Sequence, residues 1–492
     1  MHLTMLLDMA AEGFGERTIV GTADAPVTAG ELRERALRGA RLLRDRGASA
    51  LGYVAPNGPA FPVALFAAAY AGVPLVPLNY RLGEDQLGQL LGRHPGALVI
   101  GQQQVRELTG RAGLEQLSAA DWLAATAAGQ PDPGPADETA DGPAVVIYTS
   151  GTTSAPKGVL LRHRHLVSYV LGTVEFAAAS EDDVALICVP PYHIAAVANV
   201  ISNLFAGRRT VILDHFDAAG WLATVRAERV TNALVVPTML ARITEHDGDR
   251  SVPTLRALAY GGAPMPGRVI EKALALWPEV GFVNAYGLTE TSSTVAVLGP
   301  EEHREAAASS DPAVRSRLSS AGRVIPAVDL RILDDKGAEL PPGAVGRICV
   351  RGEQVSAEYD SGPAVDSRGF FDTRDEGYLD SGGFLFIGGR VDDTIIRGGE
   401  NIAPAEIENV ILEDPAVRDV AVIGVPDDEW GQRIEAVVVP VPGRTVDPEA
   451  LRQFVRARLR GSKTPDRVHV VPELPRTETG KLVRRQVGAL IG

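Results

Sequence analysis

The residues best suited to chemistry lie in one hydroxyl-rich segment, Tyr148 to Gly158 (YTSGTTSAPKG). It follows a short apolar run and combines threonine and serine hydroxyls, glycines and Lys157. Hydroxyls and the backbone N–H groups that glycine exposes can surround a phosphate, and the lysine adds positive charge. A Walker A loop does not match, because Pro156 precedes the lysine and Gly158 follows it. The segment predicts a phosphate site unlike that of P-loop kinases, against the alternative of a Ser/Thr-rich turn with a solvated lysine.

A second group of chemical residues follows the expected strand Gly281 to Asn284. Tyr286, Thr289 and Glu290 supply an aromatic ring, a hydroxyl and a carboxylate where that strand ends, and ligands of α/β sheets collect at this edge. A carboxylate together with phosphate oxygens suits Mg²⁺. The alternative is a helix start at which Glu290 favours the dipole.

Three further candidates have ordinary explanations when each is taken alone. Asp375 lies in FFDTRDEGYLDSGGF, which also fits a solvated β-turn, although its two oxygens could accept hydrogen bonds from two hydroxyls. His193 follows two prolines and also fits a core or helix-start histidine. Lys481 lies in TGKLVRR, which also fits a solvated basic tail.

Together these motifs resemble those of the adenylate-forming enzymes, the family of acyl- and aryl-CoA synthetases, luciferases and the adenylation domains of peptide synthetases. The resemblance spans nearly the whole chain. Besides the Tyr148 segment, the matches follow in the family's order: Pro190-Pro-Tyr-His193, Tyr260-Gly-Gly-Ala-Pro264, Tyr286-Gly-Leu-Thr-Glu290, Thr373-Arg-Asp375, Gly389-Arg-Val-Asp-Asp393, Gly398-Gly-Glu-Asn-Ile-Ala-Pro-Ala-Glu-Ile-Glu408 and Pro475-Arg-Thr-Glu-Thr-Gly-Lys481. One departure is Arg374, where many relatives have glycine.

The resemblance implies a nucleotide site. Its residues are Thr149, Ser150, Gly151, Thr152, Thr153, Lys157, Gly262, Ala263, Pro264, Asn284, Tyr286, Gly287, Asp375 and Arg390. By the same resemblance Tyr286 stacks on adenine, Asp375 binds the ribose hydroxyls and Arg390 is a second ribose or phosphate contact. Mg²⁺ is assigned to Glu290 with Thr152.

The catalytic residues implied by the resemblance are Lys481, His193, Thr289 and Glu290. Lys481 would enter the site during adenylation and stabilise the charge that builds on the α-phosphate, a role for which the planar guanidinium of arginine is a poor substitute. Thr289 would contact the α-phosphate. Asp392 resembles the hinge of the family, and Gly398 with Gly399 resembles its thiol tunnel.

The expected acyl pocket is apolar. Its residues are His193, Ala198, Val236, Thr238 and Gly262. The segment PPYHIAAVAN offers no acid to pair with a substrate amine, so we expect a fatty or aryl acid rather than an amino acid.

Positioning these residues requires a layered α/β fold. Short apolar runs bounded by Pro, Gly or Asp alternate with helix-length segments such as Ala218 to Arg229, which predicts mostly parallel sheets. The expected strands are Ala144 to Tyr148, Val184 to Val189, Thr210 to Leu213, Ala233 to Val236, Ala257 to Tyr260 and Gly281 to Asn284. Phe61 to Leu78 has no charge but contains three prolines, which favours a buried helix and strand over a membrane span.

Changes in sequence pattern divide the chain. We expect an N-terminal core over 1–390, with a small β subdomain over about 323–390, and a mobile α+β lid over 391–492. Gln130 to Gly142, rich in Pro, Asp and Gly, is expected to be a surface loop.

Composition excludes some classes of function. With 48 basic and 62 acidic residues, the 492-residue chain has a formal charge of −14, scattered along the sequence, which argues against nucleic acid or an anionic membrane as a partner. Two cysteines, Cys188 and Cys349, are too few for a disulfide framework, and no signal peptide is evident, so a cytoplasmic location fits.

The sequence therefore predicts a two-step ligase that uses ATP, Mg²⁺ and coenzyme A to convert a carboxylic acid into acyl-AMP and then into a thioester. One alternative acceptor is the phosphopantetheine of an acyl carrier protein. A non-catalytic nucleotide or acyl-adenylate binding module is the alternative from another class. The oligomeric state stays open, a homodimer included.

Overall fold

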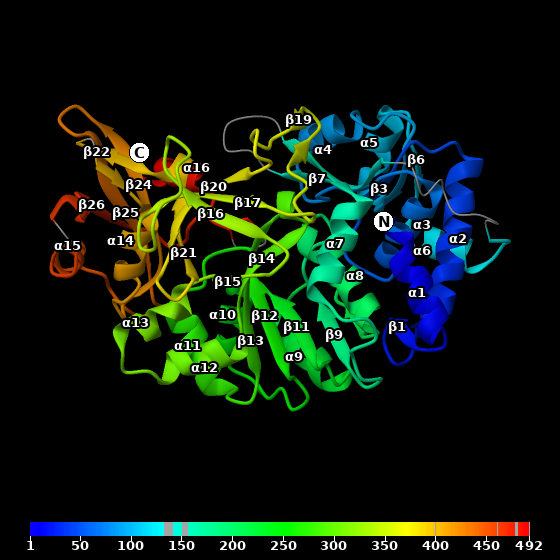
Figure 1. Ribbon diagram of the computed structural model, residues 1–492, viewed down its shortest axis with the longest axis horizontal. Coiled ribbons are helices and arrows are strands. Elements are labelled where there is room, and N and C mark those ends of the chain that lie inside the picture. Colours follow the sequence, from blue (N-terminus) through cyan, green and yellow to red (C-terminus); the bar gives the residue numbers. More distant parts are fainter. Residues whose placement is uncertain (132–140, 150–155, 399, 460, 478–480, 492) are drawn as a thin grey trace.

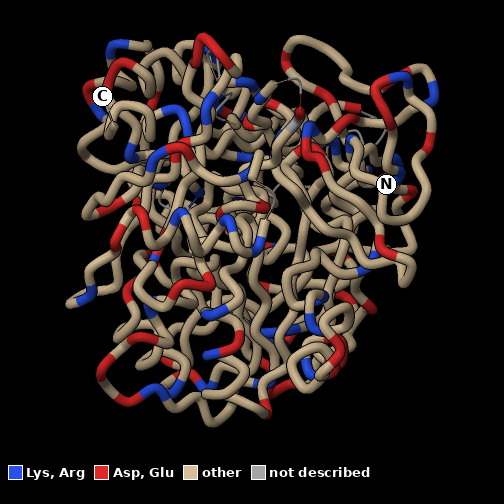
Figure 2. The backbone as a smooth tube through the Cα atoms, turned by 90° about the vertical axis from the view of Figure 1, so that its left-hand side faces the viewer, with Lys and Arg blue, Asp and Glu red and all other residues tan. Residues whose placement is uncertain are grey.

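Strands alternate with helices through the first part of the chain, as the sequence predicts. The structure, a computed structural model, describes residues 1–131, 141–149, 156–398, 400–459, 461–477 and 481–491. Figure 1 shows the N-terminal helices at one end of the molecule and the C-terminal segment, orange to red, at the other. Basic and acidic residues are interspersed on the side drawn in Figure 2, in agreement with the scattered charge of the sequence.

The largest sheet joins thirteen strands of the described chain in the order β16-β17-β20-β21-β15-β14-β13-β12-β11-β9-β10-β1-β2. Its strands from β13 to β1 pair in parallel, and those from β14 to β16 pair antiparallel. The strands are β1 (Thr18–Val20), β2 (Val27–Thr28), β9 (Val184–Ile187), β10 (Arg209–Ile212), β11 (Asn232–Val235), β12 (Ala257–Gly261), β13 (Gly281–Leu288), β14 (Ser293–Leu298), β15 (Gly322–Val324), β16 (Asp329–Leu333), β17 (Gly346–Arg351), β20 (Phe371–Leu379) and β21 (Phe384–Arg390). All six strands expected from short apolar runs are present, five here and one in the second sheet.

The second sheet has eight strands among the described residues, in the order β19-β18-β8-β7-β4-β3-β5-β6. They are β3 (Leu51–Val54), β4 (Leu75–Pro77), β5 (Leu98–Gly101), β6 (Glu115–Leu117), β7 (Pro143–Thr149), β8 (Lys157–Arg162), β18 (Glu358–Tyr359) and β19 (Gly362–Pro363). The expectation for Phe61 to Leu78 is confirmed, because buried α3 (Ala60–Ala71) ends at Gly72, whose φ is 74°, and β4 follows. No helix in the part of the chain that the structure describes is long and apolar enough to cross a membrane.

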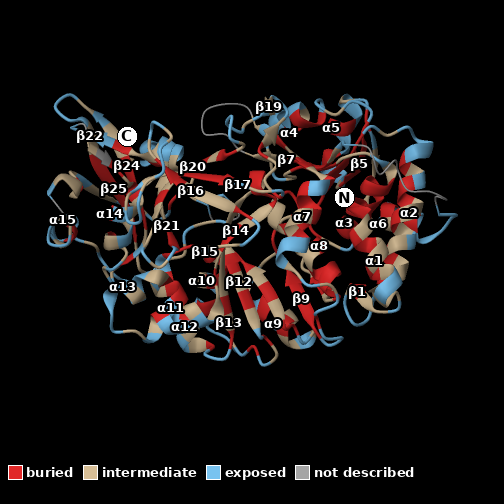
Figure 3. Ribbon diagram, in the orientation of Figure 1, coloured by how far each residue is buried: buried red, intermediate tan, exposed pale blue. Residues whose placement is uncertain are grey.

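Helices α1 to α13 accompany these two sheets, and α14 to α16 pack on the C-terminal strands described below. They are α1 (Thr4–Phe14), α2 (Ala29–Asp45), α3, α4 (Glu84–Leu91), α5 (Arg106–Arg111), α6 (Ala119–Ala127), α7 (His163–Thr173), α8 (Ile194–Ala206), α9 (Ala218–Ala227), α10 (Pro237–Glu245), α11 (Gly267–Leu276), α12 (Pro300–Ala308), α13 (Pro312–Arg315), α14 (Pro404–Ile411), α15 (Pro448–Arg456) and α16 (Arg484–Val487). Figure 3 shows buried residues gathered in the central strands and in the helices packed on them.

The β-type runs expected to form a subdomain are strands, and they extend the central sheet. β15 pairs with β14 on one side and with β21 on the other, so backbone hydrogen bonds continue from the parallel strands into this region. Its apolar residues, which include Ile332, Ile348 and Phe371, form a cluster that also contains Val295 and Ala296 of β14. Most of the expected surface loop, 132–140, lies outside the described residues.

The C-terminal segment, here called the lid, has its own sheets and core. β22 (Ile395–Arg397) pairs with β23 (Glu400–Ile402), while β24 (Val417–Asp427), β25 (Gly431–Pro440) and β26 (Arg467–Val470) form a second sheet. Apolar residues of α14, α15 and these strands form a cluster separate from that of the core. The boundary at residue 390 and the mobility of the lid stay predictions.

Candidate active site

The carboxyl ends of four neighbouring parallel strands converge at one edge of the central sheet. β13, β12, β11 and β9 lie side by side, and Val235 is level with Tyr260, which is level with Asn284. Tyr286 lies near the end of β13, and the segments that leave β12, β11 and β9 carry Gly262, Val236 and His193. Sequence motifs that are far apart in the chain therefore meet where α/β sheets bind their ligands.

Asp375 lies at this edge, held between an aromatic hydroxyl and a guanidinium. The Tyr286 hydroxyl donates to Asp375 Oδ2 at 2.6 Å, and Arg390 Nε lies 3.1 Å from Oδ1. The residue is 7% exposed. Burial raises the pKa of the Asp375 carboxyl, while Arg390 and the Tyr286 hydrogen bond act against the rise. The same carboxylate raises the already elevated pKa of Tyr286, whose burial is the larger cause.

A bulge in β20 directs Asp375 into the site. Across β17, Arg347 pairs with Glu376 and Cys349 pairs with Asp372, so three β20 residues face the single residue between them. Thr373 Oγ1 donates to the Ile348 carbonyl at 2.8 Å and accepts from Asp375 N at 3.1 Å. Bulges beside active sites commonly redirect a side chain in this way.

Arg374, the departure from the family pattern, has left-handed backbone geometry. Its φ is 62°, a region that favours glycine, and its N–H donates to Asp372 Oδ1 at 2.8 Å. The departure therefore falls at a position where glycine would be unstrained.

Glu290 and Lys157 both contact Tyr359, the first at its hydroxyl and the second over its ring. The Tyr359 hydroxyl donates to Glu290 Oε1 at 2.8 Å, and Lys157 Nζ lies 5.5 Å from the ring centroid. Burial and the Glu290 carboxylate raise the pKa of Tyr359. Glu290 is 9% exposed, and among the described residues no cluster of three or more His, Cys, Asp or Glu could hold a metal ion. The donors present fit Mg²⁺ held by one carboxylate and the oxygens of a bound phosphate chain.

Tyr359 is a site residue that the sequence analysis missed. It reaches Glu290 because β18 pairs with β8, with Tyr359 opposite Val159. Its surrounding sequence, AEYDSG, has no motif, so only the long-range pairing of strands could have revealed it.

Lys481 of the lid belongs to the same electrostatic site as these core residues. Arg476 forms an antiparallel backbone bridge with Leu482, and Thr477 N donates to the Lys481 carbonyl at 2.7 Å, so these backbone contacts hold Lys481 next to Thr477. The side chain is exposed to solvent, but surrounding protein partly desolvates the ammonium and lowers its pKa.

Charged neighbours act on Lys481 in both directions. Arg390 lowers its pKa further, whereas the carboxylates of Asp375 and Glu290 raise it. The structure thus brings the predicted catalytic lysine to the predicted ribose and magnesium carboxylates.

Several predicted site residues near Tyr286 shape or anchor the backbone around it. A Cβ at Gly287 would lie 1.8 Å from the Ser293 carbonyl oxygen, so the β13–β14 hairpin requires glycine there. Thr289 opens the 3₁₀ turn Thr289–Thr291 that follows β13. Asn284 Nδ2 donates to the Ser320 carbonyl at 2.8 Å and anchors the segment before β15. Ala263 and Pro264 follow β12 beyond Gly262, whose φ is 81°.

The structure brings part of the expected acyl pocket together. A Cβ at Gly262 would lie 3.9 Å from Val236 Cγ1, and Val236 is buried. Thr238 is in the first turn of α10. His193 immediately precedes α8, on which Ala198 is buried, and its ring centroid lies 4.8 Å from that of Tyr192.

The predicted hinge and thiol-tunnel residues lie on the lid side. Asp392 is in the turn Val391–Asp393, between β21 and β22. Gly398, with φ 57°, lies beside the Trp430 ring of the lid, and its N–H donates to the Trp430 carbonyl at 2.8 Å. Ser150, Gly151, Thr152, Thr153 and Gly399 lie outside the described residues, so their roles stay predictions.

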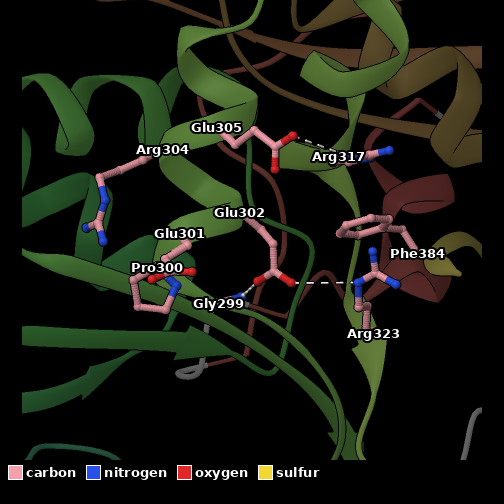
Figure 4. A pocket seen from close by; sticks show the side chains of 9 residues that line it. All are labelled: Gly299, Pro300, Glu301, Glu302, Arg304, Glu305, Arg317, Arg323 and Phe384. Atoms are coloured by element: carbon pink, nitrogen blue, oxygen red, sulfur yellow. Dashed lines mark hydrogen bonds and ion pairs between the residues drawn. The ribbon is translucent and has the colours of Figure 1, made fainter. Parts of the chain in front are cut away.

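A polar hollow of about 650 Å³ lies at the opposite edge of the central sheet, next to the start of α12 (Figure 4). Its guanidiniums, Arg317 and Arg323, lie over the Phe384 ring, with their central carbons 4.4 and 4.3 Å from its centroid. Glu302 and Glu305 face these arginines. The charges offset one another here, and none of the predicted site residues lines this hollow.

Comparison with known proteins agrees with this geometry. The family model described as AMP-binding enzyme matches residues 7–360, and that of the AMP-binding enzyme C-terminal domain matches 406–481. The chain is 34% identical to a feruloyl-CoA synthase from Amycolatopsis sp., over 96% of each chain. It is also 34% identical to the fatty acid–[acyl-carrier-protein] ligase ScoC from Streptomyces coeruleorubidus, over 86% of this chain and 83% of that protein.

Solved structures share the whole fold. The o-succinylbenzoate CoA synthetase (MenE) from Bacillus subtilis, in complex with its acyl-adenylate intermediate, superimposes with a TM-score of 0.85 and 28% identity, over 98% of this chain and 97% of that one. A second structure of that enzyme, with ATP and magnesium ion, gives a TM-score of 0.82 and 28% identity over 98% and 99% of the chains. The chain belongs to the AMP-binding enzyme family and is an adenylate-forming ligase.

Proposed function

We propose that this protein is an ATP-dependent acid–coenzyme A ligase. In the first step a carboxylate oxygen bonds to the α-phosphorus of ATP, the bond to the bridging oxygen breaks, and pyrophosphate leaves. In the second step the sulfur of coenzyme A bonds to the acyl carbon, the bond to the AMP oxygen breaks, and the thiol proton is released. The observation that carries this proposal is the geometry at the carboxyl edge of the parallel strands, where Asp375 contacts Tyr286 and Arg390 and interacts electrostatically with Lys481 of the lid.

The core residues bind and orient the nucleotide in this proposal. Asp375 and Arg390 provide acceptors and donors for the ribose, and the Tyr286 ring lies beside them. Glu290, oriented by Tyr359, would hold Mg²⁺ together with phosphate oxygens, and the bound ion would neutralise phosphate charge. Lys157 supplies a cation beside the Tyr359 ring. A nucleotide held in this way presents its α-phosphate in a fixed geometry, which favours an in-line attack.

Lys481 provides the charge that the transition state needs. Negative charge accumulates on the α-phosphate oxygens as the carboxylate attacks, and a positioned ammonium stabilises it. The neighbouring carboxylates favour the charged form of this lysine. Because the lysine comes from the lid, catalysis of this step depends on lid position while nucleotide binding depends mainly on the core.

The acid is proposed to be an aryl or fatty acid without an amino group. Val236 and Gly262 form an apolar wall next to the nucleotide site, and the PPYHIAAVAN segment contributes no carboxylate. The named relatives act on feruloyl and fatty acyl groups, which agrees with this class.

A carrier-protein phosphopantetheine is the second candidate acceptor, because one relative is named as an acyl-carrier-protein ligase. Competition between coenzyme A and a pantetheinylated carrier protein for the same acyl-AMP distinguishes the two. A cytoplasmic location is proposed on the two buried free thiols, Cys188 and Cys349.

The function is tested by pyrophosphate release from Mg-ATP across a panel of ferulic, phenylacetic, medium-chain fatty and small carboxylic acids, with and without coenzyme A. We expect release that requires an acid, and acyl-CoA as the product when coenzyme A is present. Pyrophosphate release without thioester formation would favour the carrier-protein acceptor. ATP binding with no acid-dependent release would favour the non-catalytic binding module.

A further inference from the structure

β20 contributes side chains to the active site and to the connection with the lid. Asp375 faces Tyr286, while the residues on either side of it contact the segment between core and lid. Arg374 Nη1 lies 3.8 Å from Asp392 Oδ2, and Thr394 Oγ1 donates to Glu376 Oε2 at 2.9 Å. β20 therefore contributes Asp375 to the proposed ribose site and also contacts the connecting segment at two points. Figure 1 shows β20 and β21 between the lid and the parallel strands.

The connecting segment, residues 391–394, is short and is held from both sides. β21 ends at Arg390 and β22 begins at Ile395, so any reorientation of the lid must pass through these four residues. Asp392 and Thr394 contact the core strand β20. Asp393 instead contacts the lid, 3.2 Å from Arg484 Nε, and Arg484 is also paired with Glu408 of α14.

The backbone at Arg374 places a cation at this connection despite local strain. Its left-handed φ of 62° disfavours a residue with a Cβ, and the bulge holds it through the side chains of Asp372 and Thr373. Such strain persists where surrounding structure fixes it, commonly at functional sites. Glycine at this position would relax the backbone but would supply no charge to Asp392.

We propose that Arg374 and Glu376 are lid-positioning residues: by holding Asp392 and Thr394 against β20, they favour the lid orientation in which Lys481 faces the nucleotide site. This inference rests on the proposed function. Both contacts depend on the observed position of residues 391–394, so we expect a reorientation of the lid through this segment to break them. Arg374 is 63% exposed at its side chain, so the pair contributes a modest bias that a thiol acceptor or product can overcome.

The test measures lid orientation without any acid substrate. Spin labels at Glu301→Cys in the core and Glu449→Cys in the lid, both exposed positions, report the distance distribution of the full chain with and without Mg-ATP. Asparagine at position 374 tolerates positive φ but lacks the charge. We therefore expect Arg374→Asn to reduce the population at the wild-type distance, relative to the population at other distances, by about two- to fivefold. Arg374→Lys is expected to retain most of the wild-type distribution. Thr394→Val, which removes the contact with Glu376, is expected to reduce the wild-type population about as much as Arg374→Asn does.

A double-mutant cycle with Asp392→Asn separates the ion pair from a backbone effect. We expect Arg374→Asn to change the distance distribution little when Asp392→Asn is already present. We also expect 0.5 M KCl to shift the distance distribution of the wild type but not that of Arg374→Asn. An equal shift in both backgrounds, or unchanged distributions in Arg374→Asn and Thr394→Val, would overturn the proposal.

Kinetics provide the second readout. In Arg374→Asn, acid-dependent pyrophosphate release is expected to fall about two- to fivefold, with thioester formation from preformed acyl-AMP unchanged or faster. A wild type that releases no pyrophosphate would contradict the proposed function but would leave the distance measurement interpretable. Equal losses in both half-reactions would count against a lid-positioning role.

Discussion

The core and the lid contribute to the active site in opposite ways. Asp375 is buried, bonded to Tyr286 and Arg390, and fixed by a bulge that uses Thr373 and Ile348. Lys481 is a solvent-exposed residue near the end of the lid, and its link to the core is electrostatic. In the proposed function, nucleotide recognition is thus preorganised in the core, whereas the lid supplies the catalytic cation. We therefore expect that nucleotide binding and the adenylation step can be impaired separately in this molecule.

Loss of Lys481 is expected to have the largest effect and to leave binding intact. Lys481→Ala should lower acid-dependent pyrophosphate release by about 10²- to 10³-fold, the usual effect of removing a charge-stabilising donor, with less than about a threefold change in the Kd for ATP. Initial rates and equilibrium dialysis measure the two quantities. The control is Lys272→Ala, an exposed lysine on α11, which should behave as wild type. Parallel losses of rate and affinity in Lys481→Ala would contradict the division between core and lid.

Loss of Asp375 should give the reverse pattern. Asp375→Ala removes charge-assisted hydrogen bonds to the ribose and leaves the Tyr286 hydroxyl without this acceptor, so the Kd for ATP should rise about 10- to 100-fold. Isothermal titration measures it, with Asp335→Ala, on an exposed loop, as the matched carboxylate control. An unchanged Kd would show that this buried carboxylate does not bind the nucleotide.

Tyr359→Phe tests whether the missed residue orients the metal carboxylate. Removing the hydroxyl deprives Glu290 of a hydrogen bond at 2.8 Å, and the magnesium concentration for half-maximal activity should rise about three- to tenfold. The matched variant Tyr378→Phe, whose ring stacks on Phe386, should keep the wild-type requirement. The same magnesium requirement in both variants would show that the Tyr359 hydroxyl does not orient Glu290 for metal binding.

The pH profile reports the environment of Lys481. Its pKa is lowered by desolvation and Arg390, and in the proposed function only the charged ammonium stabilises the transition state. The alkaline decline of kcat/KM for pyrophosphate release should therefore fall below the ordinary lysine value of about 10.4, because raising the pH removes the proton earlier. Lys481→Arg, if it retains activity, should lack this decline. An identical decline in both enzymes would assign it to another group.

The smallest effect concerns stability at the boundary between the two regions. A left-handed non-glycine residue costs about 1–2 kcal/mol, and an exposed ion pair contributes about 0–1 kcal/mol. Arg374→Gly should thus raise the free energy of unfolding by up to about 2 kcal/mol, measured by urea denaturation. A decrease would mean that the guanidinium stabilises the fold more than its backbone conformation destabilises it.

Much of the fold and of the site could be predicted because the determinants are local. Short apolar runs bounded by Pro, Gly and Asp became β9 to β13, and parallel pairing then placed Tyr286 and Gly262 at one edge. Lys481 could be assigned only through the family motif, since nothing within TGKLVRR indicates that it approaches Asp375.

The remaining features depend on long-range pairing or backbone geometry. Tyr359 reaches Glu290 through the β18–β8 pair, which brings together segments about 200 residues apart. The contact between Arg374 and Asp392 depends on a bulge and a positive φ, neither of which the residue types around it predict. The sequence pattern indicated a β subdomain within the core, but it could not show that β15 joins this region to the central sheet by backbone hydrogen bonds.

The central claim is that the lid lysine catalyses adenylation on a nucleotide held by the core. Its most direct test compares both half-reactions in one preparation of Lys481→Ala: pyrophosphate release from ATP and acid, and acyl-CoA formation from preformed acyl-AMP and coenzyme A. We predict that the first falls by about 10²- to 10³-fold while the second stays within about threefold of wild type. Retained pyrophosphate release, or an equal loss of both half-reactions, would contradict the claim.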